Sequence, residues 1–137
     1  MTASAALAKK GFLPETTLSC RGSYSLGKKA FRCWKKSGHG AQVIREAIKN
    51  SCNVFFYQAG RIAGVDSIAK YSAMFGFGHP SGIDLPGEVS GLVPNRMWKT
   101  LKKREPWYEG ETLNYAIGQG YLSVSYTHLT LPTKRIV

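Results

Sequence analysis

The sequence predicts a mixed α/β (α+β) domain dominated by a helical lobe and its adjoining loops. Three stretches between residues 42 and 75 carry apolar residues at helical spacing, one directly after the other. Glycines interrupt residues 12–40, and glycine and proline together fill residues 76–94, so turns and short extended pieces are expected there. A chain of 137 residues with 43% hydrophobic content can form one core, and at most one domain.

The first forty residues predict a short helix followed by irregular structure. Residues 1–10 are rich in alanine, end on two lysines and run into Gly11, which predicts a helix with a glycine stop. Because a natural domain usually opens on a loop or strand, this beginning suggests a start inside a domain. Residues 12–40 show little periodicity, so we expect a long loop or short irregular strands that need a further constraint.

Two predicted helices meet near Ser51. Residues 42–50 predict an amphipathic helix, because apolar and charged residues fall on opposite faces. A central buried helix follows, capped by Ser51 or Asn50, with Phe55, Ala59 and Ile62 on one face. The apolar face of the first helix is expected to comprise Val43, Ile44, Ala47 and Ile48.

A third helix completes the lobe. Asp66 is its predicted cap, and Ile68, Tyr71 and Phe75 are in register along it. The residues that follow, 76–94, have the composition of turns around a few extended apolar positions. Three consecutive helices of this kind are expected to pack as a small lobe.

The charge of the chain is strongly positive. Lysine and arginine number 19 against 8 acidic residues, for a net charge of +11. Such an excess suits a polyanion, such as nucleic acid, a phospholipid surface or an anionic cell-wall polymer. The basic residues are dispersed in twos and threes, however, which favours a solvated basic surface. No apolar run approaches the roughly 18–20 residues that cross a bilayer.

Residues 95–111 are basic and aromatic together, with Trp98, Trp107 and Tyr108 among lysines and arginines. Aromatic rings in a cationic surround stack on single-stranded bases, so one interpretation is a small basic zinc-binding module that contacts nucleic acid. The interpretation we favour is a helix and loop whose tryptophans anchor the segment to the core. An interaction domain without chemistry is a third alternative.

A Ser-x-Asn triplet, Ser51-Cys52-Asn53, stands directly before the apolar run of the central helix. A hydroxyl and an amide beside the unpaired backbone N–H groups of a helix N-terminus can hold a substrate amide or carboxylate. The alternative is that serine and asparagine are simply good N-caps.

Three cysteines and one histidine cluster in the same part of the sequence. Cys20, Cys33, His39 and Cys52 follow the spacing C-x12-C-x5-H-x12-C. Three thiolates and an imidazole form a tetrahedral set that zinc favours, and four protein ligands close a structural site. The alternatives are a disulfide that leaves one thiol free, or a Cys52 that is merely buried.

Five ordered blocks of this sequence resemble one family. The blocks are GFLPETTLSC, FRCWKKSGHG, SCNVFFYQ, FGFGHPSGIDLPGE and the WK, PWYEG and IGQGYL series. Together, over about residues 2–122, they look like the transpeptidase domain of a class B penicillin-binding protein of the elongation (penicillin-binding protein 2) type. The resemblance implies the penicillin-binding protein/β-lactamase-like transpeptidase fold, present here as a partial domain.

The resemblance also implies an activity. Such enzymes are serine acyltransferases that cross-link peptidoglycan stem peptides at D-Ala-D-Ala through a covalent acyl-enzyme, and they bind β-lactams. Their nucleophile is the serine of a Ser-x-x-Lys motif. By this resemblance Ser51 relays a proton towards the lysines and the leaving group, and the Asn53 amide holds the substrate backbone.

Two of the family's three active-site motifs have no match at the expected place in the chain. Ser-x-x-Lys with its flanking Pro-Gly does not occur, and neither Lys-Thr-Gly nor Lys-Ser-Gly follows the Ser-x-Asn triplet, because the Lys36-Ser37-Gly38 triplet precedes it. We therefore expect residues 1–122 to be an internal part of a transpeptidase domain, without activity of its own for lack of the nucleophile. Residues 123–137 do not match the family, and part of them resembles a translated library adapter, so an unrelated, poorly ordered tail is expected.

The resemblance strengthens the metal hypothesis as well. Elongation-type enzymes can hold a metal at the middle residue of the Ser-x-Asn triplet and at the histidine of Gly-His-Gly, which here are Cys52 and His39. Zinc bound with Cys20 and Cys33 would be structural and would fasten the irregular loop to the central helix. The parent protein is expected in the bacterial inner membrane with this domain in the periplasm, among membrane proteins of the elongation complex, and without a nucleic-acid partner.

Overall fold

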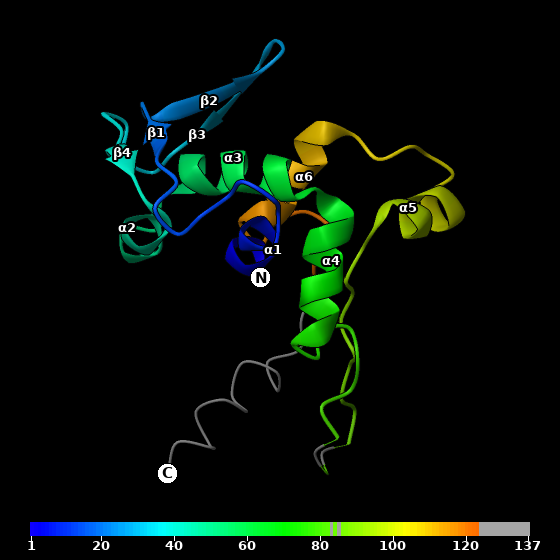
Figure 1. Cartoon of the computed structure of the whole chain (residues 1–137). Helices are drawn as coiled ribbons and strands as arrows, with labels where there is room; N and C mark the ends of the chain where they lie inside the picture. Colours follow the sequence, from blue (N-terminus) through cyan, green and yellow to red (C-terminus); the bar gives the residue numbers. More distant parts are fainter. Residues whose placement is uncertain (83, 85, 124–137) are drawn as a thin grey trace.

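The computed structural model describes residues 1–82, 84 and 86–123, and its mixed α+β architecture confirms the predicted class. Helices form the centre, and short strands lie beside the N-terminal half of the longest helix (Figure 1). The helices are α1 (Thr2–Leu7), α2 (Ile44–Lys49), α3 (Asn53–Ala63), α4 (Val65–Met74), α5 (Arg96–Lys103) and α6 (Glu109–Ala116). The strands are β1 (Leu18–Cys20), β2 (Ser23–Leu26), β3 (Lys29–Arg32) and β4 (Gly40–Gln42).

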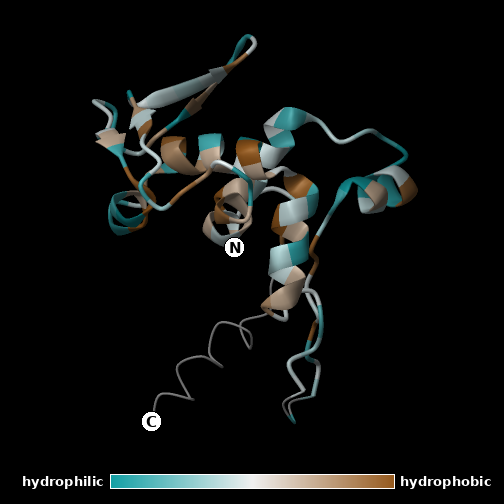
Figure 2. Ribbon diagram, in the orientation of Figure 1, coloured by the Kyte–Doolittle hydropathy of each residue, from teal (hydrophilic) through white to brown (hydrophobic). Residues whose placement is uncertain are grey.

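Helix α3 is the centre of the packing. It lies against α1, α4 and α6, and its N-terminal half also contacts the strands (Figure 1). The approach to α6 is very close, because a methyl group added at Gly60 would lie only 2.3 Å from the Cβ of Ala116. The hydroxyl of Thr2 donates a hydrogen bond of 2.8 Å to the carbonyl oxygen of Ala116, which ties α1 to the same place. Parts of α3 and α4 are accordingly hydrophobic, whereas the turn of the β2–β3 hairpin and much of α2 are hydrophilic (Figure 2).

The strands form two small antiparallel pairs, β1 with β4 and β2 with β3. The irregular strands expected between residues 12 and 40 are thus present, but the β2–β3 hairpin is more regular than the sequence indicated. Its two-residue turn begins at Gly27, where φ is +58°. Glycine at the first position of such a turn carries no steric penalty.

A close backbone contact folds the cysteine-bearing loop on itself. A methyl group at Gly38 would lie 2.2 Å from the carbonyl oxygen of Cys20, and one at Gly22 would lie 2.0 Å from that of Lys36. Separations below 3.0 Å do not occur for real Cβ atoms, so residues 20–22 and 36–38 can touch only through glycine. This contact brings β1 beside the segment that follows β3.

The three predicted helices are confirmed as α2, α3 and α4, but some expected core positions are wrong. Ile48 is 58% exposed, Ile62 is 46% exposed and Phe75 is 60% exposed. Apolar spacing identifies a stripe along a helix, but the neighbouring elements decide how much of that stripe they cover. On α3 the neighbours cover Gly60 and Ala63 and leave Ile62 outside.

The predicted helix caps are also wrong. The N-cap of α3 is Cys52, whose Sγ accepts a hydrogen bond of 3.5 Å from the N–H of Phe55. Gly64 precedes α4, so Asp66 lies in its first turn, where its carboxylate accepts bonds from the backbone N–H and the Nε of Arg96. A thiol is not among the residues that sequence rules favour as caps, which explains the first error.

Helix α5 stands apart from the central helices (Figure 1). Its buried residue is Lys99, whose ammonium bonds to Glu111 at 2.6 Å and lies 4.5 Å from the ring centroid of Tyr108. Met97 and Leu101 are exposed on the same helix. The ion pair between buried Lys99 and partly buried Glu111 therefore links α5 to the start of α6.

The C-terminal end of the described chain returns to the long loop. Ser123 pairs with Leu92 in an isolated antiparallel bridge. The rest of the predicted tail, residues 124–137, lies outside the described residues. Within the described part of the chain, no helix has the length and apolar character needed to cross a bilayer.

Candidate functional site

The Ser-x-Asn triplet occupies the corner between α2 and α3. Helix α2 ends at Lys49, Asn50 is its C-cap, and Ser51 has a left-handed conformation with φ of +46°. A non-glycine residue in this region carries a strain of about 1–2 kcal/mol, so surrounding contacts must hold it there. Asn53 then begins α3, which brings the serine and the asparagine to the same end of that helix.

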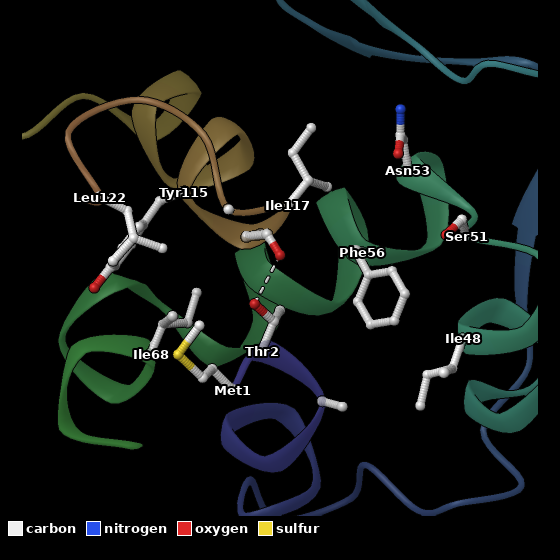
Figure 3. Close-up of a pocket in the computed structure, with 13 residues that line it drawn as sticks. Met1, Thr2, Ile48, Ser51, Asn53, Phe56, Ile68, Tyr115, Ile117 and Leu122 are labelled. Atoms are coloured by element: carbon white, nitrogen blue, oxygen red, sulfur yellow. Dashed lines mark hydrogen bonds between the residues drawn. The ribbon is translucent and has the colours of Figure 1, made fainter. Parts of the chain in front are cut away.

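An open cavity of about 470 Å³ lies beside this corner. Ser51 and Asn53 line one end of it, together with Ile48 and the ring of Phe56 (Figure 3). Helices α1, α4 and α6 contribute the other side, where the lining includes Ile68, Tyr115 and Ile117. The cavity therefore offers a hydroxyl and an amide at the edge of a largely apolar surface, an arrangement that can orient a peptide-like ligand.

The structure brings together all four predicted metal ligands. The Sγ atoms of Cys20 and Cys33 lie 3.7 and 3.6 Å from Nδ1 of His39, and the ligand atoms of the whole set, including Cys52, are within 4.8 Å of one another. All three cysteines are buried and are free thiols, rather than a disulfide pair with a spare. Tetrahedral zinc, with bonds of about 2.3 Å to sulfur and 2.0 Å to nitrogen, requires S–N separations of about 3.5 Å.

The chemistry of the donor set also fits a metal. Burial alone would raise the pKa of the Cys33 thiol, but the backbone N–H groups of Lys35, Val54 and Asn53 point at its sulfur and lower the pKa below its usual value. Burial raises the pKa of Cys52 to about 12. A thiol of that kind keeps its proton unless a cation takes the proton's place. The donor types and the distances from His39 to Cys20 and Cys33 therefore fit a Cys3His metal site, and the sulfur of Cys52 lies within 4.8 Å of the other three ligand atoms.

Sequence reasoning missed Trp34. Its indole N–H lies 3.0 Å from the carbonyl oxygen of Asn50 and 3.1 Å from that of Ser51, and its ring meets the ring of His39 edge-on at 5.1 Å. Trp34 stands 16 and 17 positions before its two partners. Neither periodicity nor motif spacing reports such a contact.

The tryptophans of the basic segment have structural partners. The indole N–H of Trp107 donates to the hydroxyl of Thr112 at 2.8 Å, and its ring packs against the core. The ring of Trp98 lies 5.4 Å from that of Tyr121. This arrangement supports the anchoring interpretation of the segment and offers no row of free rings for stacking bases.

Comparison with known proteins agrees with this geometry. The family model for the penicillin binding protein transpeptidase domain matches residues 1–135. The peptidoglycan D,D-transpeptidase MrdA of Salmonella typhimurium (strain SL1344) is 41% identical over 110 residues, which are 79% of this chain and 18% of that protein. MrdA of Haemophilus influenzae is 35% identical over 137 residues, covering 98% of this chain and 21% of that protein.

Solved structures give the same result. PBP2 of Pseudomonas aeruginosa superimposes with a TM-score of 0.88 at 34% identity, covering 94% of this chain and 30% of that one. PBP2 of Helicobacter pylori, in its complex with MreC, gives a TM-score of 0.86 at 34% identity, covering 93% of this chain and 25% of that one. The chain spans about a fifth of the length of the curated relatives it matches. On this evidence the chain belongs to the penicillin-binding protein transpeptidase family.

Proposed function

We propose that this chain supplies the Ser-x-Asn part of a peptidoglycan D,D-transpeptidase, which cross-links stem peptides through a serine acyl-enzyme and binds β-lactams. The observation that carries the proposal is the position of Ser51 and Asn53 together at the edge of the cavity. The family supports the reaction class. The two Ser-x-x-Lys tetrads of the chain lack the family's flanking Pro-Gly: one begins at Ser25 in the β2–β3 hairpin and the other at Ser67 inside α4. In this proposal neither serine is the nucleophile, so the chain by itself does not form the acyl-enzyme.

The two polar side chains have different tasks in this proposal. Asn53 has an amide that both donates and accepts hydrogen bonds, so it suits the backbone of an extended stem peptide or the amide side chain of a β-lactam. Ser51 has a hydroxyl that can accept one proton while it donates another, which suits a relay towards a leaving amine. Both groups are held at a fixed helix end rather than on a free loop, which limits the entropy lost on binding.

The function is tested by acylation with a fluorescent penicillin. The isolated chain stays unlabelled, whereas a chimaera in which residues 1–122 replace the matching segment of the Salmonella typhimurium relative is labelled. Asn53→Ala in the chimaera slows acylation about 100-fold, the usual effect of removing one group that binds the transition state. Ser25→Ala, which removes an exposed hydroxyl on the hairpin, is the matched control. Covalent labelling of the isolated chain, or an Asn53→Ala chimaera that reacts at the control rate, contradicts the proposal.

We further propose that Cys20, Cys33, His39 and Cys52 hold one structural zinc ion. Its role is to fasten the loop of residues 20–39 to the start of α3, and it takes no part in acyl transfer. Cobalt(II) is the probe, because thiolate coordination gives it intense charge-transfer absorption. One equivalent is bound by the native chain and lost in His39→Ala, but retained in His79→Ala, which removes an exposed histidine outside the cluster. Absence of thiolate-to-cobalt absorption under reducing conditions refutes the site.

The partner proteins and the cellular location are proposed for the longer protein of which this chain is a part. A solved complex joins PBP2 of Helicobacter pylori to MreC, and another structure concerns a peptidoglycan synthase complex. By analogy we assign the parent of this chain to the elongation complex, at the inner membrane with the transpeptidase domain in the periplasm. Copurification of the chimaera with an MreC protein from the same cell tests this assignment.

A further inference from the structure

Trp34 is an exposed aromatic residue whose polar and apolar parts are both engaged. Its side chain is 63% exposed, so burial of apolar surface contributes little to its position. Its N–H nevertheless lies within hydrogen-bond distance of two consecutive carbonyl oxygens, those of Asn50 and Ser51. A shared donor of this kind fixes the orientation of both peptide groups at once.

The two carbonyl groups belong to the corner that needs a restraint. Ser51 has a left-handed φ of +46°, and its own N–H reaches back to Ile48 at 3.2 Å. The next N–H, of Cys52, bonds to the carbonyl oxygen of Ala47 at 3.0 Å. The backbone thus closes the corner onto α2, and the indole N–H of Trp34 binds its two carbonyl groups.

Trp34 also lies between this corner and the cysteine cluster. It follows Cys33 directly in the sequence, and its ring lies 5.1 Å from the ring of His39. The sulfur of Cys33 in turn faces the backbone N–H groups of Asn53 and Val54. The dipeptide Cys33-Trp34 therefore contacts both the cysteine–histidine cluster and the backbone of the Ser-x-Asn triplet.

We propose that Trp34 is a positioning residue: its indole N–H clamps the Asn50–Ser51 corner and so sets Ser51 and Asn53 at the cavity. Because the ring of Trp34 contacts His39, a change in the position of the Cys20–Cys33–His39–Cys52 cluster moves the indole and, with it, the Ser-x-Asn motif. The effect on transpeptidation rests on the proposed function, whereas the clamp itself does not.

The first experiment separates the N–H from the ring. Trp34 is replaced by benzothienylalanine, which keeps the shape of indole but has sulfur in place of the N–H, and amide hydrogen exchange is followed by NMR. Exchange at Ser51 and Cys52 accelerates about tenfold, as loss of one hydrogen bond to the corner requires. Trp107→Phe, which removes a different indole N–H, leaves both rates unchanged. Unchanged exchange in the benzothienylalanine protein overturns the clamp.

The second experiment uses the penicillin-reactive chimaera. Trp34→Phe lowers the acylation rate about tenfold, and the benzothienylalanine version shows the same loss although its shape is native. Wild-type acylation in the benzothienylalanine version overturns the positioning role. A chimaera that is not labelled even with Trp34 contradicts the proposed function instead, and the exchange experiment then decides the clamp alone.

Discussion

Cys52 combines two structural tasks in one side chain. It is the middle residue of the Ser-x-Asn triplet, and its sulfur caps α3 by accepting the N–H of Phe55. The same sulfur lies within 4.8 Å of the ligand atoms of Cys20, Cys33 and His39. A shift of the cluster would therefore move the first turn of α3, which carries Asn53.

The sequence identified the residues of the site, but not how they are held. The spacing of cysteine and histidine predicted a four-residue set, and the structure brings that set together. The sequence could not predict Trp34, because its hydrogen bonds span positions that no periodic pattern connects. It also assigned the cap to Ser51 or Asn50, because hydroxyl and amide caps are far commoner than a thiol cap.

Tyr115 gives a prediction of pH dependence. Burial raises the pKa of this phenol to about 12, so ionisation favours the unfolded chain, where the pKa is near 10. The stabilisation is complete below pH 10 and is lost as pH rises through about 12, a change of about 3 kcal/mol in the free energy of unfolding. Urea unfolding between pH 9 and 12 should therefore show a steeper loss in the native chain than in Tyr115→Phe.

The matched control for that experiment is Tyr108→Phe, which removes a hydroxyl from a tyrosine that is 56% exposed. Its stability curve should run parallel to that of the native chain. If the stability of Tyr115→Phe falls with pH as steeply as that of the native chain, the buried phenol does not contribute to the alkaline loss of stability.

At the scale of the elements, the sequence predicted helices better than their contacts. Three successive apolar stripes correctly gave α2, α3 and α4. Burial was predicted less well: Ile48 and Ile62 belong to these stripes but are exposed. An apolar stripe on a helix does not reveal where the element that covers it ends. Short irregular strands were expected around residues 23–32, but not a regular β2–β3 hairpin. Strand β2 alternates between exposed and half-buried residues over only four positions, and β3 does not alternate, so cross-strand pairing rather than local pattern defines the hairpin.

The contact between α3 and α6 predicts the effect of a single methyl group. Gly60→Ala would place a Cβ 2.3 Å from that of Ala116, which forces the helices apart and costs about 1–3 kcal/mol of unfolding free energy. Adding Ala116→Gly vacates the same space and should recover most of that loss. Chemical denaturation of the single and double variants measures both effects. Additive losses in the double variant would show that the two helices do not meet at this point.

The glycine contact in the cysteine loop predicts a specific loss of metal binding. Gly38→Ala would place a methyl group 2.2 Å from the carbonyl oxygen of Cys20, so β1 and the His39 segment must separate. Cobalt affinity should fall at least about tenfold, the scale of effect seen when the support of a metal ligand is removed.

Gly27→Ala is the control for that loss. Gly27 also has a positive φ, of +58°, but no atom lies within 4 Å of an added methyl group. Backbone strain is therefore common to both variants, and only Gly38→Ala adds a clash. Equal affinities in the two variants would mean that the close approach of the loop is not needed for the cluster.

At the scale of the whole molecule, the chain carries one candidate active-site motif on a partial domain. In the part of the chain that the structure describes, the sheets are two separate antiparallel pairs, and the chain spans about a fifth of the length of its curated relatives. The net charge of +11 contributed little to the assignment, because the basic residues are dispersed and the segment around Trp107 is anchored by Thr112. Ordered motif blocks indicated the family, whereas composition alone left nucleic acid, a phospholipid surface and an anionic cell-wall polymer open and favoured a solvated basic surface.

We propose above all that the cysteine cluster and the Ser-x-Asn corner form one unit that a metal ion organises. The most direct test of this proposal is a zinc titration of the isotope-labelled chain under reducing conditions, following the amide resonances of Ser51, Cys52 and Asn53 by NMR. We predict that these resonances shift, reach an end point at one equivalent of zinc, and become protected from exchange. Resonances that remain unchanged through several equivalents would contradict it.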